Sequence, residues 1–221
     1  MLESIPQYRR NFLPHLTITI LDNDRPGPGK PVTNFAADIG TQFSGDVKAV
    51  ARQGDGRLVV GGQFSSVNGT NRNNVARVFA HGALDASFGT EAGANSAVYA
   101  VALQADGQAV IAVAFSSVQG TNRPGCARLT TSGVLDTNFV PPKLSSFPIH
   151  NALVIQPDGK IIVGGNFAFG GTNLARLNTN GALDATFAVS AGANGSIYSL
   201  ALQPDGKVLV GGSFTSCNGQ A

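Results

Sequence analysis

Four short sequence markers recur along this chain in the same order, at intervals of about 50 residues. The first is Gln-x-Asp-Gly, and its copies begin at Gln53, Gln104, Gln156 and Gln203. A phenylalanine stands 11 positions after the start of each copy, at Phe64, Phe115, Phe167 and Phe214. A fixed period of this length is typical of a repeat architecture, in which each repeat is one supersecondary unit that stacks on its neighbours.

Two further markers complete the repeat. An Ala-Arg pair ends at Arg77, Arg128 and Arg176. A Leu-Asp-x-x-Phe segment follows it, with its acidic residue at Asp85, Asp136 and Asp184. Each arginine precedes its aspartate by 8 residues. If a three-residue loop ending in glycine joins the two markers, each arginine faces its aspartate across a hairpin, and the spacing predicts a structural ion pair.

Each repeat is expected to contain four short strands. The first precedes Gln-x-Asp-Gly, as in residues 197–203, and the Asp-Gly pair predicts a two-residue type I′ hairpin. The second strand is a continuous apolar run, as in residues 207–210, which indicates burial of both faces. The third strand carries Ala-Arg, and the fourth is Leu-Asp-x-x-Phe.

The fold class follows from how such units bury their surfaces. A lone four-stranded sheet leaves one face exposed, whereas radially stacked sheets cover both faces. The prediction is therefore an all-β, partial β-propeller with about four blades of four-stranded antiparallel sheet; the alternative is a β-solenoid of stacked repeats. Only 13% of residues are charged and 28 are glycine, which suits a protein rich in tight turns.

The repeat positions also predict domain boundaries. Residues 1–24 belong to a preceding domain, residues 25–31 form a linker, and residues 32–221 hold the propeller repeats. Within them we expect a partial repeat at 32–46, repeats at 47–97, 98–148 and 149–196, and a truncated one at 197–221. Partial repeats leave unpaired sheet edges. We expect the chain to be a fragment of a longer protein, with these edges paired to the rest of the parent chain.

A family resemblance rests on these same motifs. The run from Leu202 to Phe214, together with residues 175–178 and 181–187, resembles the delta-60 repeat. The resemblance covers roughly residues 31–221 and departs in the second repeat, where Ala112-Val113 replaces a Gly-Gly pair. It implies a β-propeller of unknown function in a large secreted or cell-surface protein of bacteria, and hence an extracellular location.

The N-terminal segment carries a second resemblance. Residues 16–24 alternate threonine with apolar residues and resemble the last strand of a Calx-beta domain. Calcium takes 6–8 oxygen ligands, and Asp22 and Asp24 lack the others. We therefore expect no cofactor and no metal in this chain, and assign any Ca²⁺ to the missing neighbouring domain.

Charge and composition exclude several functions. The net charge is +2 and the basic residues form no patch, so nucleic-acid binding is not expected. No apolar run reaches the roughly 20 residues of a membrane span, so membrane insertion is not expected. Cys126 and Cys217 stand where other repeats have small apolar residues, which predicts a packing role.

The repeat leaves no catalytic constellation. One acidic residue recurs before glycine in every first turn, at Asp55, Asp106, Asp158 and Asp205. Carboxylates that repeat once per blade lie far apart, whereas acid–base catalysis needs a close pair. These aspartates are therefore interpreted as turn formers, and no catalytic residue is assigned.

The sequence favours a non-catalytic structural or binding module that recognises glycan or protein through loops on one propeller face. The most polar insertions contain Gly-Thr-Asn-Arg, so the candidate contact residues are Asn71, Arg72, Asn122 and Arg123. One alternative is a polysaccharide-acting propeller enzyme, for which His150 would be the starting point. Another is a passive spacer in a surface adhesin.

Overall fold

The computed structural model describes residues 43–89, 93–112, 115–143, 152–169, 172–187 and 192–217. All of the regular secondary structure in these ranges consists of β-strands. The segment resembling a Calx-beta strand, the linker and His150 lie outside the described residues. The domain boundaries drawn from the repeat therefore stay predictions.

The first two repeats share one layout. Each forms a three-stranded antiparallel sheet in which the second strand is central. In the first repeat the strands are β1 (Asp46–Arg52), β2 (Leu58–Gln63) and β5 (Val75–Val78), with a small hairpin of β3 (Ser66–Val67) and β4 (Thr70–Asn71) inserted before the last. In the second they are β6 (Ala100–Leu103), β7 (Ala109–Ala112) and β10 (Cys126–Leu129), with a hairpin of β8 (Ser117–Val118) and β9 (Thr121–Asn122).

The last two repeats are variations on this layout. The third joins its central and last strands directly: β11 (Ala152–Ile155), β12 (Ile161–Phe169) and β13 (Thr172–Leu177). The fourth contributes two paired strands, β14 (Ser196–Leu202) and β15 (Val208–Ser213). The shorter third repeat agrees with its sequence, since only 9 positions separate Phe167 from Arg176, against 13 between Phe64 and Arg77.

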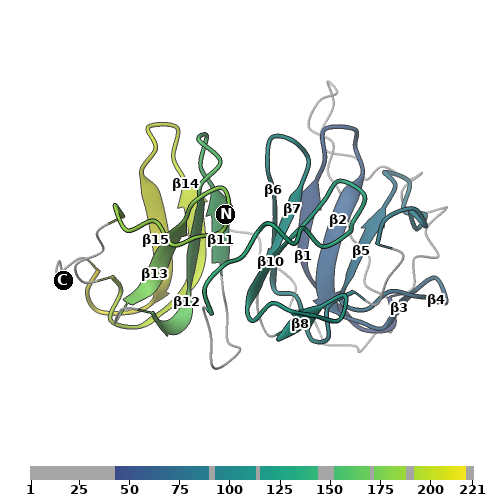
Figure 1. Ribbon diagram of the computed structural model, residues 1–221, viewed down its shortest axis with the longest axis horizontal. Coiled ribbons are helices and arrows are strands. Elements are labelled where there is room, and N and C mark those ends of the chain that lie inside the picture. Colours follow the sequence, from purple (N-terminus) through teal and green to yellow (C-terminus); the bar gives the residue numbers. More distant parts are fainter. Residues whose placement is uncertain are drawn as a thin grey trace, which may run out of the picture.

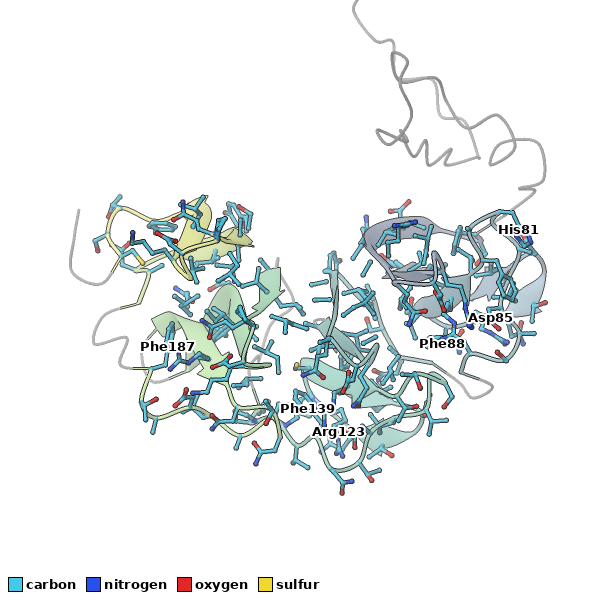
Figure 2. All side chains as sticks on the ribbon, turned by 90° about the horizontal axis from the view of Figure 1, so that it is seen from above. His81, Asp85, Phe88, Arg123, Phe139 and Phe187 are labelled. Carbon is cyan, nitrogen blue, oxygen red and sulfur yellow. The ribbon has the colours of Figure 1, made fainter. Side chains whose placement is uncertain are left out.

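The four sheets follow one another along an arc (Figures 1 and 2). The first strands of successive repeats, β1, β6, β11 and β14, contact each other in turn. This is the arrangement of consecutive propeller blades around an axis, as the sequence predicted. The arc is not closed, because the sheets of the first and last repeats lie at its opposite ends (Figure 2).

The turn at each Gln-x-Asp-Gly segment differs from the expected two-residue type I′ hairpin. The Gly56 amide donates to the Gln53 carbonyl at 3.0 Å, and the Gln53 amide donates to the Arg57 carbonyl at 2.7 Å. Gly56 has a φ of +88°, whereas Asp55 is not in the left-handed region. The loop is therefore a three-residue type I turn closed by a left-handed glycine. The hairpin itself is present, but its positive φ is carried by the glycine alone.

The fourth segment of each repeat is shorter than the predicted strand. It contributes a single bridge in each of the first three repeats: Val78 to Leu84, Leu129 to Leu135 and Leu177 to Leu183. The chain turns immediately afterwards, because the Phe88 amide donates to the Asp85 carbonyl at 3.2 Å. Ser87 also donates to the Asp85 carboxylate through its amide and its hydroxyl. These bonds to Asp85 end the strand after one pair.

Side chains from neighbouring sheets make up the core. The first and second repeats share a cluster that includes Val59, Val75, Val98 and Ile111. Two further clusters join the second repeat to the third and the third to the fourth. Burying one such aliphatic side chain contributes roughly 1.5–3 kcal/mol, so these shared clusters stabilise the contacts between blades. The central strands of the first three repeats are buried on both faces, as their continuous apolar runs predicted. The prediction is wrong for residues 207–210 of the fourth repeat, because β15 pairs on one side alone among the described residues and Leu209 is 57% exposed.

The Gly-Gly pairs after the central strands mark two close approaches. A Cβ on Gly61 would lie 2.6 Å from Cγ1 of Val98, in the next blade. A Cβ on Gly62 would meet the backbone of β1, at the bulge between Val47 and Ala49. The absence of a side chain therefore leaves room for the neighbouring blade at the first glycine and for the bulge of β1 at the second.

The second repeat, which has Ala112-Val113 instead, pairs differently. Its first strand begins only at Ala100, which pairs with Ala112. The Val98 amide donates to the Gly62 carbonyl of the first blade at 2.9 Å. The segment that leads into β6 thus forms one of its backbone hydrogen bonds with the first blade.

Candidate functional site

The repeated arginines and aspartates lie opposite one another at the end of each sheet. Nε of Arg77 donates to the Asp85 carboxylate at 2.8 Å, and both residues are at least 95% buried. The same ion pair recurs with Arg128 and Asp136 at 2.9 Å, and with Arg176 and Asp184 at 2.8 Å. The loop before each aspartate has three residues and ends in glycine, so the 8-residue spacing places the two side chains together.

Each of these arginines also lies over the phenylalanine of Leu-Asp-x-x-Phe. The guanidinium carbons of Arg77, Arg128 and Arg176 lie 4.5, 4.8 and 4.6 Å from the ring centroids of Phe88, Phe139 and Phe187. The three rings follow one another along the arc in Figure 2. A partly desolvated cation over an aromatic face is stabilised by the ring quadrupole. The fourth marker therefore supplies both partners of the arginine, its carboxylate and its ring.

Bonds between blades start from the same side chains. Nη1 of Arg77 donates to the Thr131 carbonyl of the second repeat at 2.6 Å, and Nη1 of Arg128 donates to the Thr179 carbonyl of the third at 2.7 Å. The marker glutamine acts in parallel, since Nε2 of Gln53 donates to the Gly107 carbonyl at 3.3 Å. We call the Gln, Arg, Asp and Phe of one repeat, with the carbonyls they reach, the inter-blade network.

The role of the glutamines was not predicted from the sequence. Gln104 repeats the pattern by donating to the Gly159 carbonyl at 3.3 Å, while its side-chain oxygen accepts from Arg128. The signal that could have revealed this role is the constancy of glutamine at one position, which a turn alone does not require. The inter-blade network thus uses the glutamine of Gln-x-Asp-Gly, the arginine of Ala-Arg, and both the aspartate and the phenylalanine of Leu-Asp-x-x-Phe.

Hydrogen bonds lower the pKa values of the network aspartates. Burial would raise the pKa of Asp85, but bonds from Ser87, Arg57 and Arg77 outweigh it and lower the pKa to about 2. At Asp184, bonds from Thr186 and Lys160 hold the pKa well below its usual range. These carboxylates are therefore ionised at neutral pH, which suits an acceptor in a structural pair and not a proton donor.

The turn aspartates do not come together. Asp55, Asp106, Asp158 and Asp205 lie at the tips of four separate hairpins, and each accepts a hydrogen bond from the amide two residues on. This bond from Arg57 is the main cause of a lowered pKa at Asp55. Within the described ranges, no group of three or more His, Cys, Asp or Glu residues could hold a metal ion.

The candidate contact loops project from the opposite end of the sheets to the hairpins that carry these aspartates (Figure 1). The side chains of Asn71 and Asn122 are exposed. Arg72 and Arg123 instead turn toward their own blades, donating to the Ala86 and Thr137 carbonyls at 3.2 Å each. The arginines therefore hold the loops, and the asparagines face solvent.

In the first, second and fourth repeats, one side chain on the segment that enters the blade anchors the loop. The Asn95 carboxamide accepts from the Ser116 and Ser117 amides at 3.0 Å each. Ser44 plays the same part in the first repeat, and Asn194 in the fourth. Sequence reasoning missed these anchors, because they lie about 20 residues from the loops they hold.

The structure also shows the surroundings of one histidine and one cysteine. His81 is exposed and its ring stacks on Phe79, with centroids 5.6 Å apart. Cys126 is fully buried, and burial raises the pKa of its thiol to about 12. No helix in the described part of the chain is long and apolar enough to cross a membrane.

Solved structures with a similar fold include three bacterial proteins. The extracellular domain of BT3049 from B. thetaiotaomicron, a proposed hybrid two component system, has a TM-score of 0.53 at 15% identity, over 87% of this chain and 23% of that one. The extracellular domain of BT4673 from the same organism, a proposed one component system, has a TM-score of 0.47 at 22% identity, over 78% and 20%. Virginiamycin B lyase from Staphylococcus aureus has a TM-score of 0.46 at 12% identity, over 76% and 50%.

This chain thus spans about a fifth of each extracellular domain and half of the lyase. Comparison with curated protein sequences gave no match. One family does match, over residues 53–88, 104–139, 156–187 and 203–221, and each of these segments begins at the Gln-x-Asp-Gly marker of a repeat. They make up more than half of the chain, which belongs to the family described as Domain of unknown function (DUF5122) beta-propeller.

Proposed function

We propose that this chain is a non-catalytic structural or binding module of a secreted or cell-surface bacterial protein, which recognises glycan or protein through the loops at one end of its blades. The observation that carries the proposal is that polar residues in two parts of the repeat have different roles. The recurrent charged side chains are used inside and between blades, whereas the β3–β4 and β8–β9 hairpins expose polar side chains and are dispensable for the blade.

The third repeat supports this dispensability. Its β12 ends at Phe169 and β13 begins at Thr172, with no inserted hairpin, yet it keeps the same ion pair and sheet order. Polar loops held on a rigid scaffold are the usual position of binding residues. The likeness of the fold to the extracellular domain of BT3049 supports an extracellular location.

The test is a binding screen of the full chain against arrays of bacterial and host glycans and of extracellular matrix proteins. We expect a ligand whose affinity falls at least tenfold, by about 1.4 kcal/mol, in the Asn71→Ala/Asn122→Ala double variant. Ser132→Ala, at the exposed tip of a turn at the other end of the sheets, is the matched control and should bind normally.

Two results would contradict the proposal. One is a ligand that binds the double variant and the natural sequence equally well. The other is turnover of a polysaccharide, seen as new chain ends in the glycans incubated with the protein. Arg72 and Arg123 are left intact in this experiment, because they also hold the loops in place.

A further inference from the structure

The hairpins β3–β4 and β8–β9 have the same sequence pattern and the same backbone. Residues 65–72 and 116–123 differ at one position, where Gln119 stands in place of Asn68. The two turn residues have φ values of 50° and 74° in the first hairpin and 48° and 73° in the second. Each hairpin is closed by two pairs at equivalent positions: Ser66–Asn71 and Val67–Thr70, then Ser117–Asn122 and Val118–Thr121. Two neighbouring blades therefore present the same threonine and asparagine in the same local geometry.

Each hairpin is fixed to its own blade. Its inward-facing valine, Val67 or Val118, is fully buried in the blade core. The arginine that follows, Arg72 or Arg123, donates to two backbone carbonyls and has a buried Nε. Contact residues that are already held in place lose less conformational entropy when a ligand binds.

The short segment 93–95 fixes the spacing between the two hairpins. The Ala94 amide donates to the carbonyl of Asn73, just after the first hairpin, at 3.1 Å. The Gly93 carbonyl accepts from the amide of Gln119, at the turn of the second hairpin, at 2.7 Å. Both hairpins also project from the same end of the sheets (Figure 1). A ligand that reaches both must therefore offer the same contact group twice, at one spacing.

The exposed part of each hairpin is polar and uncharged. Residues 68–71 are Asn-Gly-Thr-Asn, and residues 119–122 are Gln-Gly-Thr-Asn. Hot spots for protein partners are enriched in Trp, Tyr and Arg, and neither segment contains one of these. The exposed carboxamides of Asn71 and Asn122 can donate to and accept from sugar hydroxyl groups. Because neutral hydrogen bonds contribute modestly, one hairpin alone would bind weakly.

We infer that the two hairpins are equivalent subsites for one uncharged polysaccharide, whose repeating units place one sugar on each hairpin. The inference rests on the proposed function and narrows its ligand from glycan or protein to a neutral glycan polymer. Once one hairpin is occupied, binding at the other is intramolecular, and such linkage raises the overall affinity by roughly 10²–10⁴-fold. The third blade adds no such subsite, since its β12 and β13 follow each other without an inserted hairpin.

The test compares long and short chains of the same sugars. The probes are dextran, pullulan, mannan and laminarin, each together with its own short oligosaccharides. Alginate is the charged counterpart, and collagen is the protein counterpart. Isothermal titration calorimetry with the full chain measures the affinity and the number of oligosaccharides bound per chain.

We expect at least one neutral polymer to bind, and its oligosaccharide to bind more weakly with two molecules per chain. Asn71→Ala and Asn122→Ala should each lower the affinity for the polymer about tenfold or more, by similar factors, since either change removes the linkage. Each single variant should bind one oligosaccharide at unchanged affinity, and the double variant none. Both asparagines are exposed, so the variants should keep the natural unfolding midpoint. Ser132→Ala should bind both probes as the natural chain does.

The outcomes separate this inference from the proposed function. A matrix protein that binds through both asparagines, with no neutral polymer bound, would keep the proposed function and overturn the inference. The same holds for a glycan whose affinity does not depend on its length, or whose binding is lost in only one of the two single variants. Absence of binding to every neutral polymer would also overturn the inference. A probe that binds the double variant and the natural chain equally would overturn both.

Discussion

Nη1 of Arg77 lies 2.6 Å from the carbonyl oxygen of Thr131, a residue 54 positions later in the next blade. Nε of the same side chain donates to Asp85, and its guanidinium lies over Phe88. One arginine thus ties together its own hairpin, its own aromatic ring and the neighbouring sheet. Because the bond to Thr131 crosses between blades, losing the arginine should weaken the interface as well as the blade.

We predict that Arg128→Ala lowers the free energy of unfolding by about 2–4 kcal/mol, because it leaves the mostly buried Asp136 without its charged partner. Arg128→Lys should recover only part of the loss, since an ammonium group cannot reach Asp136 and the Thr179 carbonyl in the same fork geometry. Urea unfolding measures the effect. Lys143→Ala, at an exposed position, is the control, and an equal loss in both alanine variants would contradict the assignment.

Acid should destabilise the fold at a pH set by the network aspartates. A carboxyl group with a lower pKa in the folded chain stabilises the fold above its unfolded pKa of about 3.9. That contribution is lost as the pH falls through the folded pKa, which is about 2 for Asp85. The free energy of unfolding should therefore be level from pH 7 to about 5 and fall steadily toward pH 2.

The comparison for this prediction is Asp85→Asn, measured by urea unfolding at the same series of pH values. It should be less stable at pH 7 and show a shallower fall below pH 5, so that the two curves converge near pH 2. A natural chain whose stability is unchanged at pH 2.5 would contradict the role given to these aspartates.

The first glycine of each Gly-Gly pair, which leaves room for the next blade, leads to a prediction about packing. A Cβ on Gly164 would lie 2.5 Å from Cγ2 of Ile197, so Gly164→Ala should cost about 1–3 kcal/mol of unfolding free energy. Ile197→Ala in the same chain should offset part of that cost, a coupling that independent sites do not show. Gly54→Ala is the control, because its Cβ would meet nothing within 4 Å. Additive losses would disprove the contact.

Thiol chemistry should separate the two cysteines. Cys126 is fully buried and burial raises its pKa to about 12, so its thiolate is scarce and inaccessible in the folded chain. Ellman's reagent should react with Cys126 only at the rate of unfolding. The Cys217→Ser variant isolates this reaction, because Cys126 is then the single cysteine of the sequence. Rapid reaction without denaturant would show that the interface around Cys126 opens.

Sequence reasoning succeeded where one residue type carries a local constraint. The continuous apolar runs predicted the doubly buried central strands of the first three repeats, and the 8-residue interval placed Arg77 opposite Asp85. It failed at the first turn, because Asp-Gly suits both a two-residue and a three-residue loop. The choice depends on the pairing of Gln53 with Arg57 across the hairpin, which the dipeptide does not determine.

Contacts between repeats were harder to predict than contacts within them. Gln53 and Thr131 owe their roles to the placement of two sheets, and neither has a neighbour in sequence that signals its partner. The loop residues show the same limit. Asn71 and Arg72 look alike as polar insertions, yet only the structure separates the exposed asparagine from the arginine that binds Ala86.

The inter-blade network has a direction, since donors of the first and second repeats reach carbonyls of the repeat that follows. These two junctions therefore use the same residues in the same way, and neither depends on the number of blades. Duplication of a whole repeat by unequal recombination would insert a unit whose donors and acceptors already match both neighbours. Lineages could then lengthen or shorten such arrays without first evolving a new interface.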